Sequence, residues 1–336
     1  MTLPTRCQCA QSKTVNSKLT DFLFQKNFNF RDEQKIVAVT GRELQKAQEF
    51  AKKHQIPKFY NSYENLASDS QVDVVYIGIT THCHYEATKV FLNAGKSVLC
   101  EKPLGMNLKQ TEETIALAKS KKLFLMEAIW SRTFPVYQKL QKSLKDIGDI
   151  KHMIMTNGVS TKGPDLYVKE YGGGTVLEAA GDCLQLILLV FGPEMPSKIQ
   201  ASTVKFNENG VDLGMSVTLY FSEDRMATFN TDLRVDLPNT ANIAGTQGQI
   251  RIGSQFWCPT QLYTQINNEP EVLEDFPLPQ GAKFPFHFQS SEGLMYEADH
   301  VRQCLQANLL ESPLVPHQDS LLIARIQQEI MSQISQ

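Results

Sequence analysis

Residues 72–103 read VDVVYIGITTHCHYEATKVFLNAGKSVLCEKP, and this stretch decides the fold. Residues 72–79 are nearly all apolar, as expected of a parallel strand that is buried on both faces. Residues 84–94 have helical spacing and end at Gly95, a residue well suited to follow a helix. A second buried strand follows at residues 97–100. A strand, a helix and a strand in this order predict one βαβ unit of a doubly wound parallel sheet.

The same alternation extends to both sides of this stretch, and the pattern changes after about residue 150. The further expected strands and helices of the first part are 36–39, 44–54, 107–120 and 123–126. The later part shows longer alternating strands and two amphipathic helices, at 198–205, 213–221, 226–233, 240–252, 293–307 and 320–335. The sequence therefore predicts an α/β chain: a Rossmann-type sheet in residues 1–128, then an α+β domain with an open, mostly antiparallel sheet in residues 129–336.

Composition narrows the class of protein. The chain has 336 residues, 42% of them hydrophobic and 21% charged, with 33 basic and 36 acidic side chains mixed along its length. We expect a soluble protein that binds neither nucleic acid nor membrane, because it has no basic stripe and no apolar run near the roughly 18 residues of a membrane span. Seven scattered cysteines favour a reducing, cytoplasmic location, with a transit peptide as a less favoured alternative. Cys7 and Cys9 are too close to form a metal site alone, so no metal is expected.

The motif with the clearest chemistry is Glu101-Lys102-Pro103. A lysine at the end of a parallel strand faces the ligand crevice of such a sheet, and the proline fixes the turn that presents it. The alternative is a solvated lysine before a proline that merely ends the strand. The tripeptide alone gives the two interpretations equal weight.

Other motifs accompany this tripeptide in a fixed order. They are FAKKH at 50–54, IP at 56–57, AGK at 94–96, FLMEAIW at 124–130, Arg132, Pro135, LVFG at 189–192, WCPT at 257–260, YEA at 296–298 and HV at 300–301. From about Ile36 to Ile330 the chain resembles the glucose–fructose oxidoreductase-like (Gfo/Idh/MocA) family.

The resemblance implies an oxidoreductase that moves hydride between NADP and a small-molecule substrate. The CH–OH or CH–CH groups of cyclic dihydrodiols or aldoses are the expected targets. Separately, an exposed face on the sheet of the second domain makes a homodimer the expected assembly. In this family the lysine equivalent to Lys102 donates to the substrate oxygen and the nicotinamide ribose, often from a cis Lys-Pro bond. The residues that would border the cofactor are Thr80, Thr81, Glu101, Lys102, Trp130 and Arg132, although a core role for Trp130 is an alternative.

The residues after the second strand indicate the cofactor. NAD enzymes of this fold place an acid there to hold the ribose hydroxyls. In this chain the strand runs into Thr40-Gly41-Arg42, and a guanidinium at Arg42 suits a 2′-phosphate, with Thr40 adding a hydroxyl. This predicts NADP, and a surface arginine at a helix start is the alternative.

Glu178 and Asp182 form a second candidate site. Four residues apart, they would share one face of a helix buried through residues 184–191. Two acids at a helix start could instead interact favourably with the positive end of the helix dipole. In the resembled family this helix carries an aspartate and, four residues on, a tyrosine or histidine that act with the lysine in proton transfer. Glu178 and Asp182 occupy those positions and both depart from the pattern.

The amino terminus differs from the pattern of the resembled family more than Glu178 and Asp182 do. The family opens with a strand and a glycine turn that lets the backbone approach the pyrophosphate. Here no glycine precedes Gly41, and Asn16 and Ser17 occupy the glycine region. Residues 18–22 look like the helix that follows this turn. Residues 6–11, which would be the strand before it, are a poor core strand. Two hypotheses stay open: an active enzyme, or a non-catalytic paralogue that keeps the fold and dimer surface and binds a ligand or partner.

Overall fold

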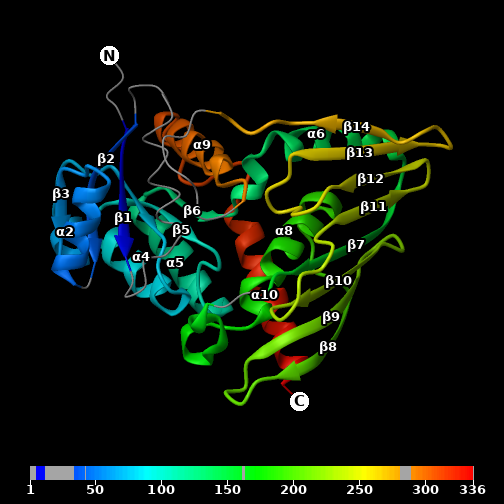
Figure 1. The fold of residues 1–336 in the computed structure, drawn as a ribbon, viewed down its shortest axis with the longest axis horizontal. Helices are drawn as coiled ribbons and strands as arrows, with labels where there is room; N and C mark the ends of the chain where they lie inside the picture. Colours follow the sequence, from blue (N-terminus) through cyan, green and yellow to red (C-terminus); the bar gives the residue numbers. More distant parts are fainter. Residues whose placement is uncertain (1–4, 12–33, 42, 161–162, 281–288, 336) are drawn as a thin grey trace. The chain divides into compact units, whose positions relative to one another are not determined.

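The computed structural model describes residues 5–11, 34–41, 43–160, 163–280 and 289–335. Contacts divide the chain into two compact units, each assembled from separate segments (Figure 1). The first unit is Met1–Gly105, Lys109–Trp130 and Leu278–His317; the second is Met106–Leu108, Ser131–Pro277 and Gln318–Gln336. The domain boundary expected between residues 128 and 129 stays a prediction.

The first unit contains a six-stranded, all-parallel sheet in the order β3-β2-β1-β4-β5-β6. Its strands are β1 (Thr5–Gln11), β2 (Gln34–Gly41), β3 (Lys58–Tyr60), β4 (Val74–Ile77), β5 (Ser97–Glu101) and β6 (Leu125–Ala128). This is the 3-2-1-4-5-6 order of a dinucleotide-binding sheet, in which ligands bind outside the carboxyl ends of the strands where the order reverses. The predicted Rossmann-type sheet is confirmed.

Strand β1 corrects one expectation. Residues 6–11 looked like a poor core strand, yet they lie at the centre of the sheet, parallel to both β2 and β4. The register shifts once, between Cys7 and Gln8. Strand propensity depends strongly on the surroundings, and two flanking strands satisfy the backbone of β1 whatever its side chains. The expectations for Asn16, Ser17 and residues 18–22 lie outside the described residues.

The first unit has five helices in the described residues, four of them near predicted positions; α3 was not predicted. They are α2 (Leu44–Lys53), α3 (Tyr63–Ala67), α4 (His84–Asn93), α5 (Leu108–Lys121) and, late in the chain, α9 (Leu294–Gln306). Short 3₁₀ turns lie at η2 (Thr81–Cys83), η3 (Trp130–Thr133) and η7 (Ser291–Gly293). Helix α4 ends as expected at Gly95, whose φ of 79° permits Lys96 N–H to return to the Phe91 carbonyl.

The second unit is built on an eight-stranded sheet in the order β14-β13-β12-β11-β7-β10-β9-β8. The strands are β7 (Ile150–Gly158), β8 (Lys198–Phe206), β9 (Asp212–Tyr220), β10 (Met226–Asp232), β11 (Ala241–Gly245), β12 (Gly248–Ile252), β13 (Gln261–Ile266) and β14 (Val272–Asp275). Only β7 and β10 run parallel, so the predicted mostly antiparallel sheet is confirmed. Residues 240–252, expected as one long strand, form a hairpin instead, because the chain reverses at Thr246 and Gln247.

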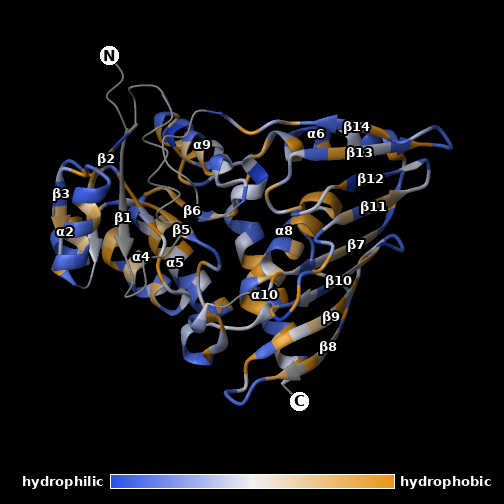
Figure 2. Cartoon of the chain, in the orientation of Figure 1, coloured by the Kyte–Doolittle hydropathy of each residue, from blue (hydrophilic) through white to orange (hydrophobic). Residues whose placement is uncertain are grey.

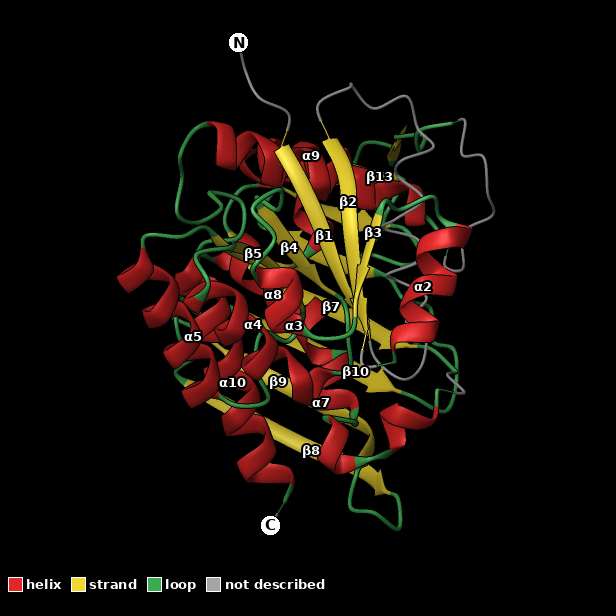
Figure 3. Ribbon diagram, turned by 90° about the vertical axis from the view of Figure 1, so that its left-hand side faces the viewer, coloured by secondary structure: helices red, strands yellow, loops and turns green. Residues whose placement is uncertain are grey.

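Helices pack on this sheet within the second unit (Figure 3). They are α6 (Pro135–Ser143), α7 (Thr175–Glu178), α8 (Ala180–Phe191) and α10 (His317–Ile334), with 3₁₀ turns η4 (Leu144–Ile147), η5 (Pro164–Tyr167) and η6 (Lys169–Tyr171). Helix α8 contacts β7 and β10, and α7 contacts β9. Residues 186–188 of α8 are at most 2% exposed, and the helix is largely hydrophobic along its length (Figure 2).

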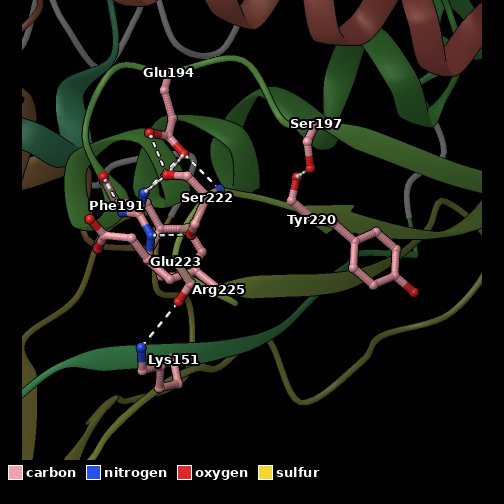
Figure 4. A network of polar contacts seen from close by, with 8 residues as sticks. All are labelled: Lys151, Phe191, Glu194, Ser197, Tyr220, Ser222, Glu223 and Arg225. Atoms are coloured by element: carbon pink, nitrogen blue, oxygen red, sulfur yellow. Dashed lines mark hydrogen bonds and ion pairs between the residues drawn. The ribbon is translucent and has the colours of Figure 1, made fainter.

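The carboxyl end of α8 is fastened to the turn between β9 and β10 by Arg225 (Figure 4). Its guanidinium donates to the Phe191 carbonyl at 2.6 Å and to Oγ of Ser222 at 2.8 Å. It also pairs with Oε1 of Glu194 at 2.9 Å. A cation at the last carbonyls of a helix satisfies its unpaired acceptors and its dipole together.

Candidate active site

Lys102 lies in the first unit, directly after β5, and its side chain is half-buried. The Lys102–Pro103 peptide bond is cis. Glu101, the last residue of the strand, is 6% exposed, and its Oε1 accepts a hydrogen bond from the hydroxyl of Tyr76 on β4 at 2.6 Å. The lysine therefore follows a strand end whose own carboxyl group is fixed inside the unit.

The residues after Lys102 are fixed in the same way. The Pro103 carbonyl accepts from Nδ1 of His84 at 2.8 Å, and Leu104 N–H donates to Oε1 of Glu127 on β6 at 3.0 Å. Sequence analysis did not single out His84, Glu127 or Tyr76 as site residues. The available signals were a histidine at a helix start and a glutamate within FLMEAIW, but their use depends on neighbours that the sheet brings together.

Thr80 and Thr81 follow the neighbouring strand β4. Both are half-exposed, and the Thr80 carbonyl accepts from Cys83 N–H at 2.9 Å to form η2. Strands β4 and β5 are adjacent and parallel, with Ile77 opposite Cys100, so the two threonines and Lys102 leave the same edge of the sheet. Of the predicted site residues, the first unit brings together Thr80, Thr81, Glu101 and Lys102.

Thr40, at the end of β2, is fully buried. Its hydroxyl lies 3.2 Å from the Tyr60 carbonyl and 3.0 Å from the Ser62 carbonyl. The hydroxyl proton is therefore donated to the backbone, and the hydroxyl oxygen could only accept a hydrogen bond from a ligand. Arg42, expected at the 2′-phosphate, lies outside the described residues. Trp130 is half-exposed at the start of η3, after β6.

In the second unit, Glu178 and Asp182 do not lie on one continuous helix. Helix α7 ends at Glu178 and α8 begins at Ala180, with a bend of 41° between the segments Lys169–Glu178 and Ala180–Phe191. The Ala179 carbonyl accepts from Nδ2 of Asn157 on β7 at 3.0 Å. The expected single helix was wrong: the chain bends at Ala179, whose carbonyl bonds to a side chain of the sheet.

Asn157 also contacts the candidate site directly. The same Nδ2 lies 3.3 Å from Oδ2 of Asp182, and Asn157 is only 5% exposed. Asp182 and Glu178 are both half-buried. The amide therefore links the helix break to the Asp182 carboxylate, and sequence analysis missed it because β7 was not predicted.

Arg132 has an extensive set of partners inside the second unit. It is 4% exposed, pairs with Oδ2 of Asp319 at 2.5 Å, and donates to the side chain and carbonyl of Gln185 at 3.1 and 2.6 Å. Nε2 of Gln185 lies 2.9 Å from the Tyr137 hydroxyl and 3.1 Å from the Asp182 carbonyl. Burial foremost raises the pKa of Tyr137, so its phenol stays protonated. The predicted contact of Arg132 with the cofactor stays a prediction.

Helix α7 is held at its start by Asp212 of β9. One carboxylate oxygen, Oδ2, accepts from Oγ1 of Thr175 at 2.6 Å and from Val176 N–H at 2.9 Å. Gly174 makes room, because a Cβ there would lie 2.2 Å from the other carboxylate oxygen. Burial raises the pKa of Asp212, and the Thr175 and Val176 hydrogen bonds oppose that rise. This cap fixes the start of the helix that carries Glu178.

Two family models match this chain in succession. An oxidoreductase family with an NAD-binding Rossmann fold (GFO/IDH/MocA) matches residues 19–129, and the GFO/IDH/MocA C-terminal domain matches residues 137–251. The chain belongs to this oxidoreductase family. The resemblance and fold class expected from the sequence are thereby confirmed, and β1 lies outside the matched residues.

Among characterised relatives, the chain is similar to trans-1,2-dihydrobenzene-1,2-diol dehydrogenases of vertebrates. The Danio rerio protein is 42% identical over 306 residues, and the Homo sapiens protein is 38% identical over 307 residues. Each alignment covers 90% of this chain and 90% of the relative.

Solved structures share the fold at lower identity. An aldose–aldose oxidoreductase from Caulobacter crescentus, complexed with glycerol, aligns with a TM-score of 0.83 at 19% identity, covering 98% of both chains. A 3-ketoreductase from Actinomadura kijaniata in complex with NADP aligns with a TM-score of 0.81 at 19% identity, again over 98% of both chains. A levoglucosan dehydrogenase in complex with NADH and levoglucosan reaches 0.83 at 17% identity, over 98% of both chains.

Within the described residues, no single helix is long and apolar enough to cross a membrane; the bent pair Lys169–Glu178 and Ala180–Phe191 is so by length and composition only. In the same ranges no group of three or more His, Cys, Asp or Glu side chains is placed to hold a metal ion.

Proposed function

We propose that the protein is an NADP-dependent dehydrogenase that acts on CH–OH or CH–CH groups of cyclic trans-dihydrodiols or aldoses, D-xylose among them. The observation that carries this proposal is the Lys102 turn, fixed at the carboxyl end of β5 in a 3-2-1-4-5-6 sheet. Identity near 40% to dihydrodiol dehydrogenases over nine-tenths of the chain supports the substrate class.

The preference for NADP over NAD rests on residues 40–42. The strand β2 leads into Thr40-Gly41-Arg42 without the acid that holds NAD ribose hydroxyls. The buried Thr40 fixes the strand end to the backbone of residues 60 and 62, and Arg42 supplies the guanidinium for a 2′-phosphate. The order of strands fits a dinucleotide outside the carboxyl ends of β1 and β4, with Thr80, Thr81, Glu101, Trp130 and Arg132 as further proposed neighbours.

The bound nicotinamide supplies the hydride acceptor or donor. Lys102 donates a hydrogen bond to the substrate oxygen and stabilises negative charge on it as the bond order changes. Asp182 takes the role that the family gives to a tyrosine or histidine and accepts the hydroxyl proton during oxidation. Positioned proton transfer of this kind contributes roughly 10²–10⁴ to the rate.

A non-catalytic paralogue that retains the fold and binds a ligand or partner is the second candidate function. No glycine precedes Gly41, and Glu178 and Asp182 replace the family's aspartate and tyrosine. These departures favour impaired cofactor binding or proton transfer, whereas the intact Lys102 turn favours catalysis.

A fluorescence titration of purified protein with NADPH and with NADH separates the two candidates. The enzyme proposal expects saturable NADPH binding, followed by NADP⁺ reduction with trans-1,2-dihydrobenzene-1,2-diol or D-xylose. A folded protein that binds neither cofactor would contradict the enzyme proposal and favour the paralogue.

We further propose a cytoplasmic homodimer. The cysteines at 83, 100, 183, 258 and 304 are free thiols, which suits a reducing compartment. Ile154, near the middle of β7, is 50% exposed on the eight-stranded sheet, a surface that a second copy could cover. Light scattering on the purified protein should give twice the mass of 37.9 kDa; a monomer at micromolar concentration would contradict the assembly.

A further inference from the structure

The backbone on both sides of Lys102 is held by buried side chains from three different elements. Tyr76 of β4 bonds to Glu101, His84 of α4 to the Pro103 carbonyl, and Glu127 of β6 to Leu104 N–H. All three side chains are at most 4% exposed. Each contact falls on a different residue of the turn, so together they fix its path.

His84 differs from the other two because it bridges two loops. Its Nδ1 lies 2.8 Å from the Pro103 carbonyl oxygen, and its Nε2 lies 2.9 Å from the Ile79 carbonyl oxygen. A carbonyl oxygen only accepts hydrogen bonds, whereas a neutral imidazole carries one N–H and one acceptor nitrogen. Both contacts are hydrogen bonds only if both ring nitrogens carry protons, which makes the ring an imidazolium.

Two acidic side chains lie beside the turn that His84 contacts: Glu101 precedes Lys102, and Glu127 accepts from Leu104 N–H. The ring of His84 is 1% exposed, and the carboxyl groups of Glu101 and Glu127 are buried in the same unit. Burial, and next the proximity of these two carboxyl groups, raise the pKa of Cys100 on β5, the strand that packs on α4. Titratable groups on β6 and on the elements packed against α4 are Tyr63, Glu64, Tyr76, His82, Cys83, Cys100, Glu101 and Glu127, with Lys102 in the turn itself.

We propose that His84 is a positioning residue for Lys102, held as an imidazolium that ties the Ile79 carbonyl to the Pro103 carbonyl. The bridge fixes the loop of Thr80 and Thr81 relative to the Lys102 turn before any ligand binds. Such preorganisation matters because a displacement of about 1 Å at a reacting group can cost roughly 10²-fold in rate. The catalytic consequence rests on the proposed function, whereas the state of the ring does not.

His317 in the same unit provides a matched control. It is 3% exposed; its Nε2 contacts one carbonyl, that of Leu125 at 2.9 Å, and its Nδ1 lies 3.5 Å from Oε2 of Glu311, beyond hydrogen-bond distance. Burial lowers the pKa of His317 and outweighs the Leu125 hydrogen bond and the Glu311 charge, which raise it, so we expect a neutral ring with one proton, on Nε2.

The first experiment is ¹⁵N NMR of the full chain at pH 7 with labelled histidine. Signals are assigned by their loss in His84→Gln and His317→Gln. We expect both ring nitrogens of His84 to carry protons and only one nitrogen of His317 to do so. An unprotonated ring nitrogen in His84 would overturn the proposal, whether or not the protein turns over a dihydrodiol.

The second experiment measures steady-state oxidation of trans-1,2-dihydrobenzene-1,2-diol by the same variants. Glutamine at position 84 retains one donor group and loses the bridge, so we expect kcat to fall about 10–100-fold with a smaller change in the KM for the diol. His317→Gln should leave kcat within about twofold. Unchanged kcat in folded His84→Gln would overturn the positioning role; if that variant does not fold, the NMR result on the wild-type protein decides.

Discussion

The turn after β5 and the break before α8 hold their candidate catalytic residues in different ways. In the first unit, the residues beside Lys102 are each bound by a separate buried side chain. In the second unit, one amide nitrogen of Asn157 is shared between the Ala179 carbonyl and Asp182, at 3.0 and 3.3 Å. The comparison shows that three separate buried side chains fix the backbone beside Lys102, whereas one amide group contacts both the helix break and Asp182.

The largest effect should come from Lys102. Replacing it with methionine keeps the length of the side chain and removes the hydrogen-bond donor, so dihydrodiol oxidation should slow by roughly 10²–10⁴. Steady-state kinetics and an NADPH titration on the same variant check this. A variant that still binds NADPH and keeps its kcat would show that the turn is structural.

Restoring the family's residues in the second unit tests the other side of the comparison. At neutral pH an ordinary carboxyl group is ionised and cannot donate a proton, whereas a phenol can. Asp182→Tyr combined with Glu178→Asp should therefore raise the rate in both directions by about 10²-fold. The two single variants serve as controls, and a double variant no faster than wild type, in protein that binds NADPH, would place the defect elsewhere.

Cofactor choice provides the third test, in the first unit. Arg42→Ala should weaken NADPH binding by about 1.5–3 kcal/mol, the scale of hydrogen bonds to charged groups. NADH binding should change little, because NADH lacks the 2′-phosphate. Equal affinities for the two cofactors in the wild-type protein would contradict this prediction.

A stability test addresses the second unit. Arg225→Met removes the donors to the Phe191 carbonyl and Glu194 at the end of α8, and we expect the free energy of unfolding to fall by about 1–2 kcal/mol. Urea denaturation measures this. Arg251→Met, which removes an ion pair with Glu271 at roughly one-third exposure on both sides, is the matched surface control and should cost about 1 kcal/mol or less.

The smallest expected effect is a pH dependence of stability in the first unit. Burial lowers the pKa of His317 in the folded protein, whereas the unfolded side chain titrates near its ordinary value of about 6.5. Below that pH the unfolded state binds the proton more readily, so the free energy of unfolding should fall as the pH drops from 7 through 6. His317→Gln should make the free energy of unfolding depend less on pH in this range. The same pH dependence in wild type and variant would exclude His317 as a cause. His152→Gln is the control.

Local patterns predicted the elements that carry the first site. Strands β4 and β5 are short apolar runs, and Gly95 between them marks the end of α4. Hydrophobic periodicity and one glycine were therefore enough to predict these three elements. The family motifs then placed Lys102 at the end of β5. The bridging role of His84 could not be predicted, because its partners, the carbonyls of residues 79 and 103, are brought together only by strand order.

The second site shows why a helical pattern was insufficient. The four-residue spacing of Glu178 and Asp182 and the apolar run after them predicted one helix through both. The break lies where Asn157 of β7, which is distant in sequence, donates to the Ala179 carbonyl. The hairpin of β11 and β12 was missed for a local reason: Thr246 and Gln247 at its tip have no strong turn propensity.

The late return of the chain to the first unit has a consequence for synthesis on the ribosome. Strand β6 lies at an edge of the parallel sheet, and its Leu125 bonds to residues made much later: its N–H to the Leu310 carbonyl at 3.1 Å, its carbonyl to His317 at 2.9 Å. An open strand edge is a template for pairing with other chains. While the eight-stranded sheet is being translated, the β6 edge of the first unit therefore lacks these two hydrogen-bond partners. Chaperone demand during translation should be greatest in that interval, and a chain that stops within it should aggregate rather than yield a stable Rossmann fragment.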